Sequence, residues 1–363
     1  MKRLEHFSAD GQIVTRRELL RLTLGTGAML AGGGLLAACG QQQGALGAPA
    51  ALPPPETTTV RIVTPSACDP GLMLAGDYLR EEGFTEVRYV DTSFVDRKWL
   101  LEREADVSLA HPEFIVASLD AGVPLVMLAG LHSGCLEVWT QPGIRSISEL
   151  RGKKIAVRRA DTSDQYYAFF ATLLGYVGID PVKDVQFVAG GNGAEMRRAF
   201  IEGRADAVLV GSATGPSFRR LPQAPGHVIL ATSTAKPWSQ YLCCTLVAPR
   251  DWARQNPIAT KRITRAVLRA TDRATKDPAR AAHDASAAAA AAAAGGDFGD
   301  ESLVRETIDM CTYDWRELDP EETLRFFALR LAEAKLIKST PQQLINQGTD
   351  LAYMRQLRKE LTP

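Results

Sequence analysis

Histidine, cysteine and glutamate side chains with the chemistry of metal ligands or nucleophiles gather in two parts of the sequence. They are His111, His132, Cys135, Glu137, Cys243 and Cys244. Histidine and cysteine are the usual protein ligands of zinc. Only His132 and Cys135 have the spacing of a ligand pair, and a loop does not fix that spacing as a helix would. We therefore expect no metal site, no catalytic residue and no cofactor.

The chain has six cysteines, of which Cys39 belongs to an N-terminal segment treated below. The other five are odd in number and scattered, and no two have the CxxC spacing of a metal or redox motif. We therefore expect no disulfide framework. Buried cysteines often act as small apolar residues, and this is the simplest interpretation of Cys135 and Cys243.

The elements that must position these side chains alternate between strand and helix patterns, which is typical of an α/β fold. Short strand-like runs occupy residues 60–64, 86–90, 105–110 and 124–128, and a second series begins near residue 147. Loops at the carboxyl ends of such strands bind small ligands in open α/β sheets. The candidate ligand-binding residues on these loops are Ser66, Cys68, His111, His132, Cys135, Arg158, Asp161, Thr162, Asn192 and Ser212.

Arg158 is the candidate best suited to an anion, because its planar guanidinium can pair with a carboxylate, sulfonate or phosphate through two hydrogen bonds. A solvated charged loop is the competing interpretation. Trp238 and Tyr241, which precede the paired cysteines, are two further candidates, although a buried crossing strand would explain the same segment. The aromatic residues at positions 166, 167, 169 and 170 could stack on a ligand or pack in the core, and their helical spacing favours the core.

Composition excludes one class of partner. The 363 residues carry 42 Lys and Arg against 42 Asp and Glu. A nucleic-acid-binding protein needs a basic surface, so we expect no nucleic-acid partner. The body from about residue 58 is long enough for two lobes.

The first 38 residues have the order of a secretory signal, with positive, apolar and small residues in turn. Arg16 and Arg17 resemble a twin-arginine export signal, and the general secretory route is the alternative. The apolar stretch is shorter than the ~20 residues of a transmembrane helix. It ends in Leu-Ala-Ala-Cys at Cys39, which resembles the lipobox of bacterial lipoproteins. We expect lipidation of Cys39 and a tether over residues 39–57.

Two motifs in the second series resemble a known family. Ser-Glu-Leu-Arg-Gly-Lys-Lys-Ile-Ala-Val occupies 148–157, and Glu-Gly-Arg-Ala-Asp-Ala occupies 202–207. With the order of elements over residues 58–360, they resemble the periplasmic substrate-binding proteins of ABC importers. Within these, the chain is similar to the nitrate, sulfonate and taurine group, which shares a fold with the fungal thiamine-pyrimidine synthases.

The resemblance implies the periplasmic-binding-protein type II fold. This is an α/β fold of two lobes, with mixed, mainly parallel sheets, flanking helices and a hinge between the lobes. Residues 58–138 and 246–363 would form lobe 1, and 139–245 would form lobe 2. The chain would cross between them near Val138 to Gln141 and near Ser239 to Leu246.

The resemblance further implies a monomeric, non-catalytic receptor in the periplasm. The lipid on Cys39 would hold it at the outer face of the inner membrane or the inner face of the outer membrane. It would capture a small polar or anionic organic solute between its lobes and present it to an ABC permease with its ATPase. Two alternatives stay open: an enzyme of the thiamine-pyrimidine type, motivated by the fold and by Cys243 with Cys244, and a solute sensor without transport.

Overall fold

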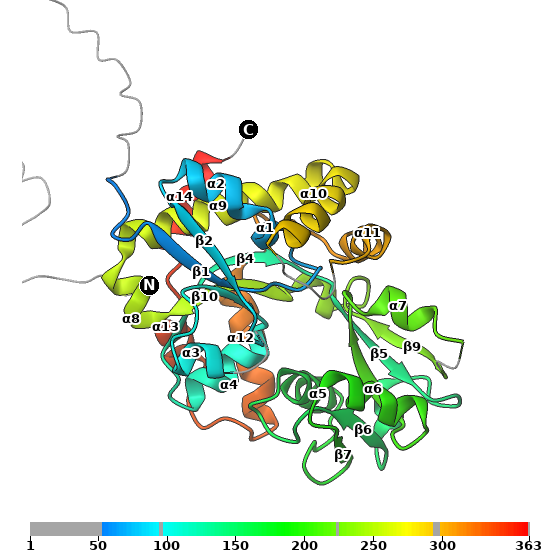
Figure 1. The fold of residues 1–363 in the computed structure, drawn as a ribbon. Helices are drawn as coiled ribbons and strands as arrows, with labels where there is room; N and C mark the ends of the chain where they lie inside the picture. The colour runs from blue at the N-terminus through cyan, green and yellow to red at the C-terminus, as the bar shows by residue number, and fades with distance from the viewer. Residues whose placement is uncertain (1–52, 94–96, 223–224, 293–297, 362–363) are drawn as a thin grey trace, which may run out of the picture. The chain divides into compact units, whose positions relative to one another are not determined.

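The computed structural model describes residues 53–93, 97–222, 225–292 and 298–361 (Figure 1). The predicted signal peptide, the predicted lipidation site Cys39 and the tether as far as residue 52 lie outside the described residues. Residues 52–363 belong to one compact unit. Among the residues described, no helix combines the length and the apolar character needed to cross a bilayer.

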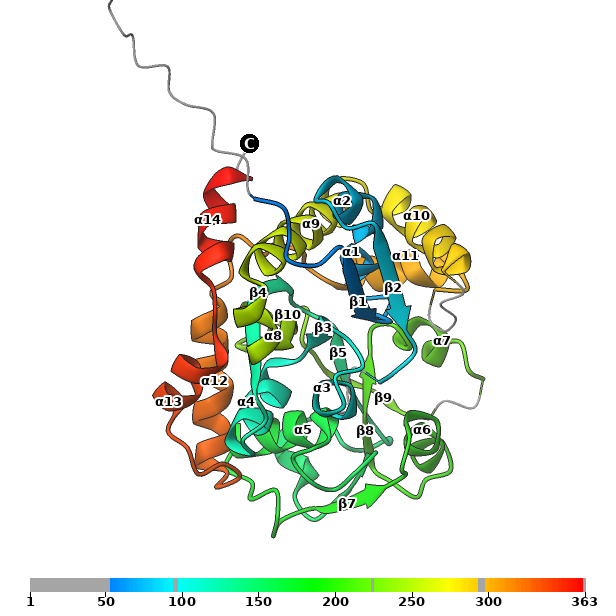
Figure 2. The same ribbon diagram turned by 60° about the vertical axis from the view of Figure 1, so that its left-hand side comes forward.

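Within the described residues, ten strands form three sheets (Figures 1 and 2). The strands are β1 (Thr59–Val63), β2 (Glu86–Val90), β3 (Ser108–Ala110), β4 (Leu125–His132), β5 (Leu136–Thr140), β6 (Lys154–Val157), β7 (Gln186–Ala189), β8 (Ala207–Gly211), β9 (His227–Ala231) and β10 (Cys244–Pro249). The sheet orders are β1-β2, β3-β10-β4 and β7-β6-β8-β5-β9. The predicted α/β fold with mixed sheets is confirmed.

The strands β5 and β10 give the sheets their mixed character. β1 and β2 are parallel, as are β6 with β7 and β6 with β8. By contrast, β5 runs antiparallel to β8 and β9, and β10 runs antiparallel to β3 and β4. Each of these two strands follows a segment in which the chain passes from one sheet to another.

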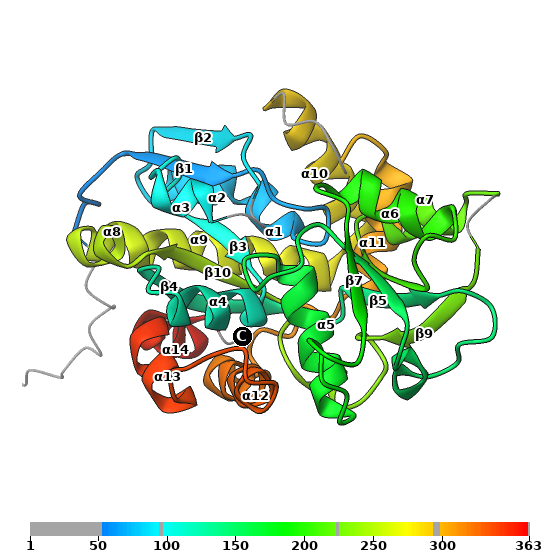
Figure 3. The same cartoon turned by 90° about the horizontal axis from the view of Figure 1, so that it is seen from below.

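Helices flank the sheets on both sides. They are α1 (Pro70–Met73), α2 (Ala75–Glu81), α3 (Lys98–Leu101), α4 (Pro112–Asp120), α5 (Gln165–Tyr176), α6 (Gly193–Ile201), α7 (Gly215–Arg219), α8 (Arg250–Gln255), α9 (Pro257–Lys276), α10 (Pro278–Ala291), α11 (Glu301–Met310), α12 (Pro320–Glu333), α13 (Pro341–Gly348) and α14 (Ala352–Glu360). The C-terminal helices return to the side of β4, where α13 and α14 contact that strand (Figure 3). Helix α12 packs against both α4 and α5 and so touches elements beside both larger sheets.

Burial and capping explain the elements nearest the centre. All eight residues of β4 are buried, and seven of them form the continuous apolar run Leu-Val-Met-Leu-Ala-Gly-Leu, which is typical of a strand covered on both faces. Helix α5 begins after Asp164, whose carboxylate accepts hydrogen bonds from the backbone N–H groups of Tyr166 and Tyr167. Such a cap satisfies amide groups that have no partner within the helix.

The chain passes between the three-stranded and five-stranded sheets at two places. The first passage is residues 133–135, between β4 and β5, and it lies ahead of the expected Val138 to Gln141 segment. The second is residues 232–243, between β9 and β10. The lobe boundaries at residues 138 and 245 stay predictions.

A disulfide between Cys135 and Cys243 joins the two passages, with the Cα atoms 6.2 Å apart. The expectation that these cysteines take no part in disulfide bonding is therefore wrong. The two residues are 108 positions apart in sequence, and the pairing of β4 with β10 brings them together. No local spacing in the sequence could reveal this. Cys68, Cys244 and Cys311 are free thiols.

Replacing both linked cysteines, as Cys135→Ser/Cys243→Ser, should lower the free energy of unfolding by about 2–4 kcal/mol, because a cross-link over 108 residues restricts the unfolded chain. Chemical denaturation of the oxidised protein measures this. Cys311→Ser, which removes a free thiol, is the matched control. Equal unfolding free energies for the double variant and the unsubstituted chain would contradict the prediction.

Candidate functional site

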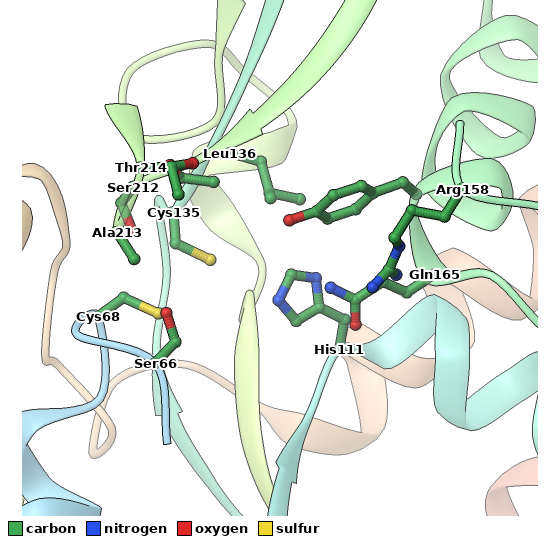
Figure 4. A pocket seen from close by; sticks show the side chains of 12 residues that line it. Ser66, Cys68, His111, Cys135, Leu136, Arg158, Gln165, Ser212, Ala213 and Thr214 are labelled. Atoms are coloured by element: carbon green, nitrogen blue, oxygen red, sulfur yellow. The ribbon is translucent and has the colours of Figure 1, made fainter. Parts of the chain in front are cut away.

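A cavity of about 200 Å³ lies where the ends of several strands meet the first passage (Figure 4). Its walls come from the loops after β1, β3, β6 and β8, from the first passage and from the first turn of α5. The lining residues are Ser66, Cys68, His111, Cys135, Leu136, Arg158, Gln165, Tyr166, Gly211, Ser212, Ala213 and Thr214. The loops at strand ends therefore converge on one space, as the topology of α/β sheets leads one to expect.

Six of the twelve residues predicted from the sequence to bind a ligand line this cavity. They are Ser66, Cys68, His111, Cys135, Arg158 and Ser212. Each one lies in a loop or passage that follows a strand. Contact of these residues with a solute stays a prediction.

Four other predicted residues lie outside the cavity because they serve local structure. Asp161 accepts hydrogen bonds from the backbone N–H and the hydroxyl of Ser163, and Thr162 accepts one through its carbonyl from Arg97. Asn192 caps α6 through a bond from the Glu195 N–H, 2.9 Å long. His132 is fully buried, beside Asp69.

Trp238 and Tyr241 also lie outside the cavity. They belong to an aromatic cluster in which Trp238 packs on Phe169 at 5.7 Å and Tyr241 stacks on Phe326 at 4.1 Å between ring centroids. The space beside them has a volume of only about 10 Å³, which is close to the room one water molecule needs. Packing in the core therefore accounts for both rings.

Six lining residues were not among the sequence candidates. Gly211, Ala213 and Thr214 belong to the same segment as the candidate Ser212, and the other three are Leu136, Gln165 and Tyr166. The helical spacing of the 166–170 segment predicts a core role, which holds for the buried residues Phe169 and Phe170. Tyr166, at the first turn of α5, faces the cavity instead. It lies two residues after Asp164, the residue that caps this helix.

Arg158 is held in place before any solute arrives. Its Nε lies 3.3 Å from Asp164 Oδ2, and its Nη2 donates to Asp164 Oδ1 over 3.3 Å. The guanidinium also lies over the ring of Tyr166, 4.6 Å from the centroid. Because Asp164 is buried and fixed by α5, the arginine fork has a defined direction at the cavity wall.

His111 has a similar buried carboxylate partner. Its Nδ1 lies 3.2 Å from Glu113 Oε1, and both side chains are buried. In the tautomer that carries its proton on Nδ1, the ring donates to Glu113 and leaves Nε2 as an acceptor facing away from this pair.

Gln165 supplies an acceptor of a different kind. The residue is 1% exposed, and among the described residues its Oε1 has no hydrogen-bond partner. Buried polar atoms are nearly always paired. Because Gln165 lines the cavity, a donor group of a bound molecule can satisfy this oxygen.

Four further groups lie together at and behind the wall formed by Cys68: Cys68, Asp69, His132 and Cys244. A hydrogen bond from the Cys244 thiol lowers the pKa of Cys68 to about 5, against the effect of burial and with the help of His132. Burial and the same bond raise the pKa of Cys244 well above its ordinary value. Burial lowers the pKa of His132, but the charges of Asp69 and Cys311 together raise it well above the ordinary value.

The chain has the periplasmic-binding-protein fold, with mixed sheets, flanking helices and a cavity lined by polar side chains. The chain belongs to the NMT1/THI5-like family, whose model matches residues 76–281. This confirms the resemblance stated from the sequence motifs. A search of curated proteins returns no match.

Solved structures with this fold include several binding proteins of the sulfonate and nitrate group. The nitrate-binding protein NrtA from Synechocystis PCC 6803 has a TM-score of 0.63 and 13% identity, with 85% of this chain and 90% of that chain covered. The alkanesulfonate-binding protein SsuA from Xanthomonas axonopodis pv. citri, bound to MOPS, has a TM-score of 0.61 and 15% identity, with 82% of this chain and 99% of that chain covered. The aliphatic sulphonate-binding protein SsuA from Escherichia coli has a TM-score of 0.58 and 14% identity, with 80% of this chain and 92% of that chain covered.

The lowered pKa of Cys68 predicts its reactivity. With a pKa of about 5 the thiol is ionised at pH 6, so iodoacetamide should label Cys68 almost as fast at pH 6 as at pH 8. An ordinary thiol with a pKa near 8.5 should slow by roughly 100-fold over the same interval. Mass spectrometry of the Cys68 peptide measures the rate.

The matched variant is Cys244→Ala, which removes the hydrogen-bond donor and should shift the labelling profile of Cys68 to higher pH. Labelling of Cys68 that follows the pH dependence of the unfolded chain would contradict the assignment.

Proposed function

We propose that this chain is the solute-binding component of an ABC import system and captures a small polar or anionic organic molecule in the cavity around Arg158 and His111. The observation that carries the proposal is a cavity lined by polar side chains from both larger sheets, with a Gln165 oxygen in its wall that has no hydrogen-bond partner among the described residues. Hinge closure around a ligand is a common use of such an arrangement. Binding without chemical conversion is the role we propose.

The size of the cavity supports a small solute. Pockets for drug-sized ligands have volumes of about 300–1,000 Å³, whereas this cavity has about 200 Å³. A compact molecule with few heavy atoms fits such a space.

The charges at the wall support a solute with a polar or anionic head. A guanidinium binds a carboxylate or sulfonate through charge-assisted hydrogen bonds. Arg158 already forms an ion pair with Asp164, and His111 is paired with Glu113. The cavity therefore suits a single anionic group combined with hydrogen-bonding groups, such as a donor for Gln165, better than a multiply charged anion.

We also propose that the protein is exported and held at a membrane by a lipid. The signal segment and the lipobox support export and lipid anchoring through Cys39, which would keep the binding body close to a permease with its ATPase. Solved structures with this fold support the partnership, since they include the ligand-binding component of an ABC-type import system from Staphylococcus aureus.

A thermal-shift screen of the purified protein with sulfonates, nitrate, pyrimidines, aromatic carboxylates and amines tests the proposal. A solute at a hundredfold excess over its Kd should stabilise the fold by about 2.7 kcal/mol. No stabilisation by any compound class would count against a solute-binding role.

For the solute found, Arg158→Ala should weaken binding by about 10- to 100-fold, because it removes a charge-assisted hydrogen bond. Titration calorimetry measures the change. Arg204→Ala, on an exposed arginine that pairs with Glu202, is the matched control and should leave the affinity unchanged. Equal affinities for Arg158→Ala and the unsubstituted chain would place the solute elsewhere.

A further inference from the structure

We propose that Cys68, Asp69, His132 and Cys244 form a binding site for a zinc-type metal ion at and behind the cavity wall formed by Cys68. One donor atom from each of these four buried residues lies within 4.8 Å of the other three. This site is separate from the solute contacts proposed for Arg158, His111 and Gln165. It therefore goes beyond the proposed function and does not depend on it.

The fold brings these donors together from three segments. Cys68 and Asp69 lie in the loop between β1 and α1, His132 ends β4, and Cys244 begins β10. Cys244 and His132 are direct partners in the antiparallel register of β10 with β4. Residues directly opposite in such a pair have their side chains on the same face, with Cβ atoms about 4.5–5.5 Å apart.

The hydrogen bonding of His132 leaves one ring nitrogen for a cation. Its Nδ1 lies 3.3 Å from the carbonyl oxygen of Ser133, and since a carbonyl only accepts, Nδ1 carries the proton of that bond. The Nε2 atom then faces Asp69 Oδ2 at 3.3 Å. Two acceptors this close share a proton, and a metal ion bound here would take the place of that proton.

The spacing and the chemistry of the donors favour the metal ion. In a tetrahedral zinc site with bonds of about 2.0–2.1 Å, nitrogen and oxygen ligands stand about 3.3–3.4 Å apart. The distance from Asp69 to His132 matches this edge. Two thiols, an imidazole and a carboxylate form a donor set that suits zinc and not magnesium or calcium. A histidine that donates its other N–H to a backbone carbonyl is also the usual arrangement around a ligated metal.

Access and coordination number indicate a structural site. The Cys68 side chain lines the cavity, so an ion can enter from there, and the other three donors are buried. Four protein ligands leave no open position for a substrate, which is typical of structural zinc. The ion would tie the β1–α1 loop to β4 and β10.

A second group of potential ligands shares Cys244 with this one. It consists of His111, Cys135, Cys243 and Cys244. Two of its cysteines are joined to each other in a disulfide, so they are not available as thiolate ligands in the oxidised protein. The proposal therefore concerns the first group only.

Cobalt(II) is the probe for the experiment, because tetrahedral thiolate coordination gives it a charge-transfer band and intense visible bands. The full purified chain, treated with a chelator and kept under inert gas, is titrated with Co²⁺ and then with Zn²⁺. We expect one Co²⁺ per chain, bands of a tetrahedral site and displacement by one equivalent of Zn²⁺. The absence of a stoichiometric tetrahedral site would overturn the proposal.

Variants identify the ligands. Cys68→Ser and Asp69→Asn should each weaken binding by about 10- to 100-fold or more, and Cys68→Ser should also reduce the charge-transfer band. Cys135→Ser/Cys243→Ser is the matched control, which should keep the cobalt spectrum. Loss of the spectrum in that control, or its retention in a Cys68→Ser variant, would overturn the assignment.

Circular dichroism of every variant in the presence of chelator confirms that the chain is folded before the comparison is made. The Arg158→Ala variant should bind Co²⁺ as the unsubstituted chain does. A failure of metal binding is thereby distinguished from a failure of solute binding, since each is measured with a different probe and a different variant.

Discussion

The close approach of the two passages between the sheets is the constraint on which the cavity depends. The segment between β4 and β5 and the segment before β10 are joined by the disulfide of Cys135 with Cys243. On one side of this link β10 pairs with β4, and on the other β5 pairs with β8 and β9. The ends of strands from both larger sheets therefore meet around the same point, and the loops that follow them line one cavity.

Buried carboxylates organise the polar groups of that cavity before a solute binds. Asp164 caps α5 and pairs with Arg158, and Glu113 pairs with His111. Each cationic or titratable group at the wall thus has a fixed direction, which lowers the cost of ordering it on binding. On the opposite wall Cys68 belongs to a second buried group with Asp69, His132 and Cys244, held by the pairing of β4 with β10.

Periodicity in the sequence predicts what depends on local pattern. The predicted strand at 86–90 coincides with β2, and the runs at 60–64 and 124–128 overlap β1 and β4. Ser66, His111, Arg158 and Ser212 follow from the rule that loops at strand ends gather at one edge. The disulfide and the cysteine and histidine group depend on the register between strands far apart in sequence, which no local spacing encodes. Trp238 and Tyr241 are unusual residues whose place in the core is decided by aromatic neighbours on α5 and α12.

Mass spectrometry of the small molecule that co-purifies with the native protein tests the central claim most directly. The protein is isolated without denaturation, its mass is measured intact, and the bound molecule is released and identified. We expect one small polar or anionic organic molecule per chain, and its loss from a protein carrying His111→Ala with Arg158→Ala. A bound molecule whose occupancy is unchanged by these two substitutions would contradict the assignment of this cavity as the solute site.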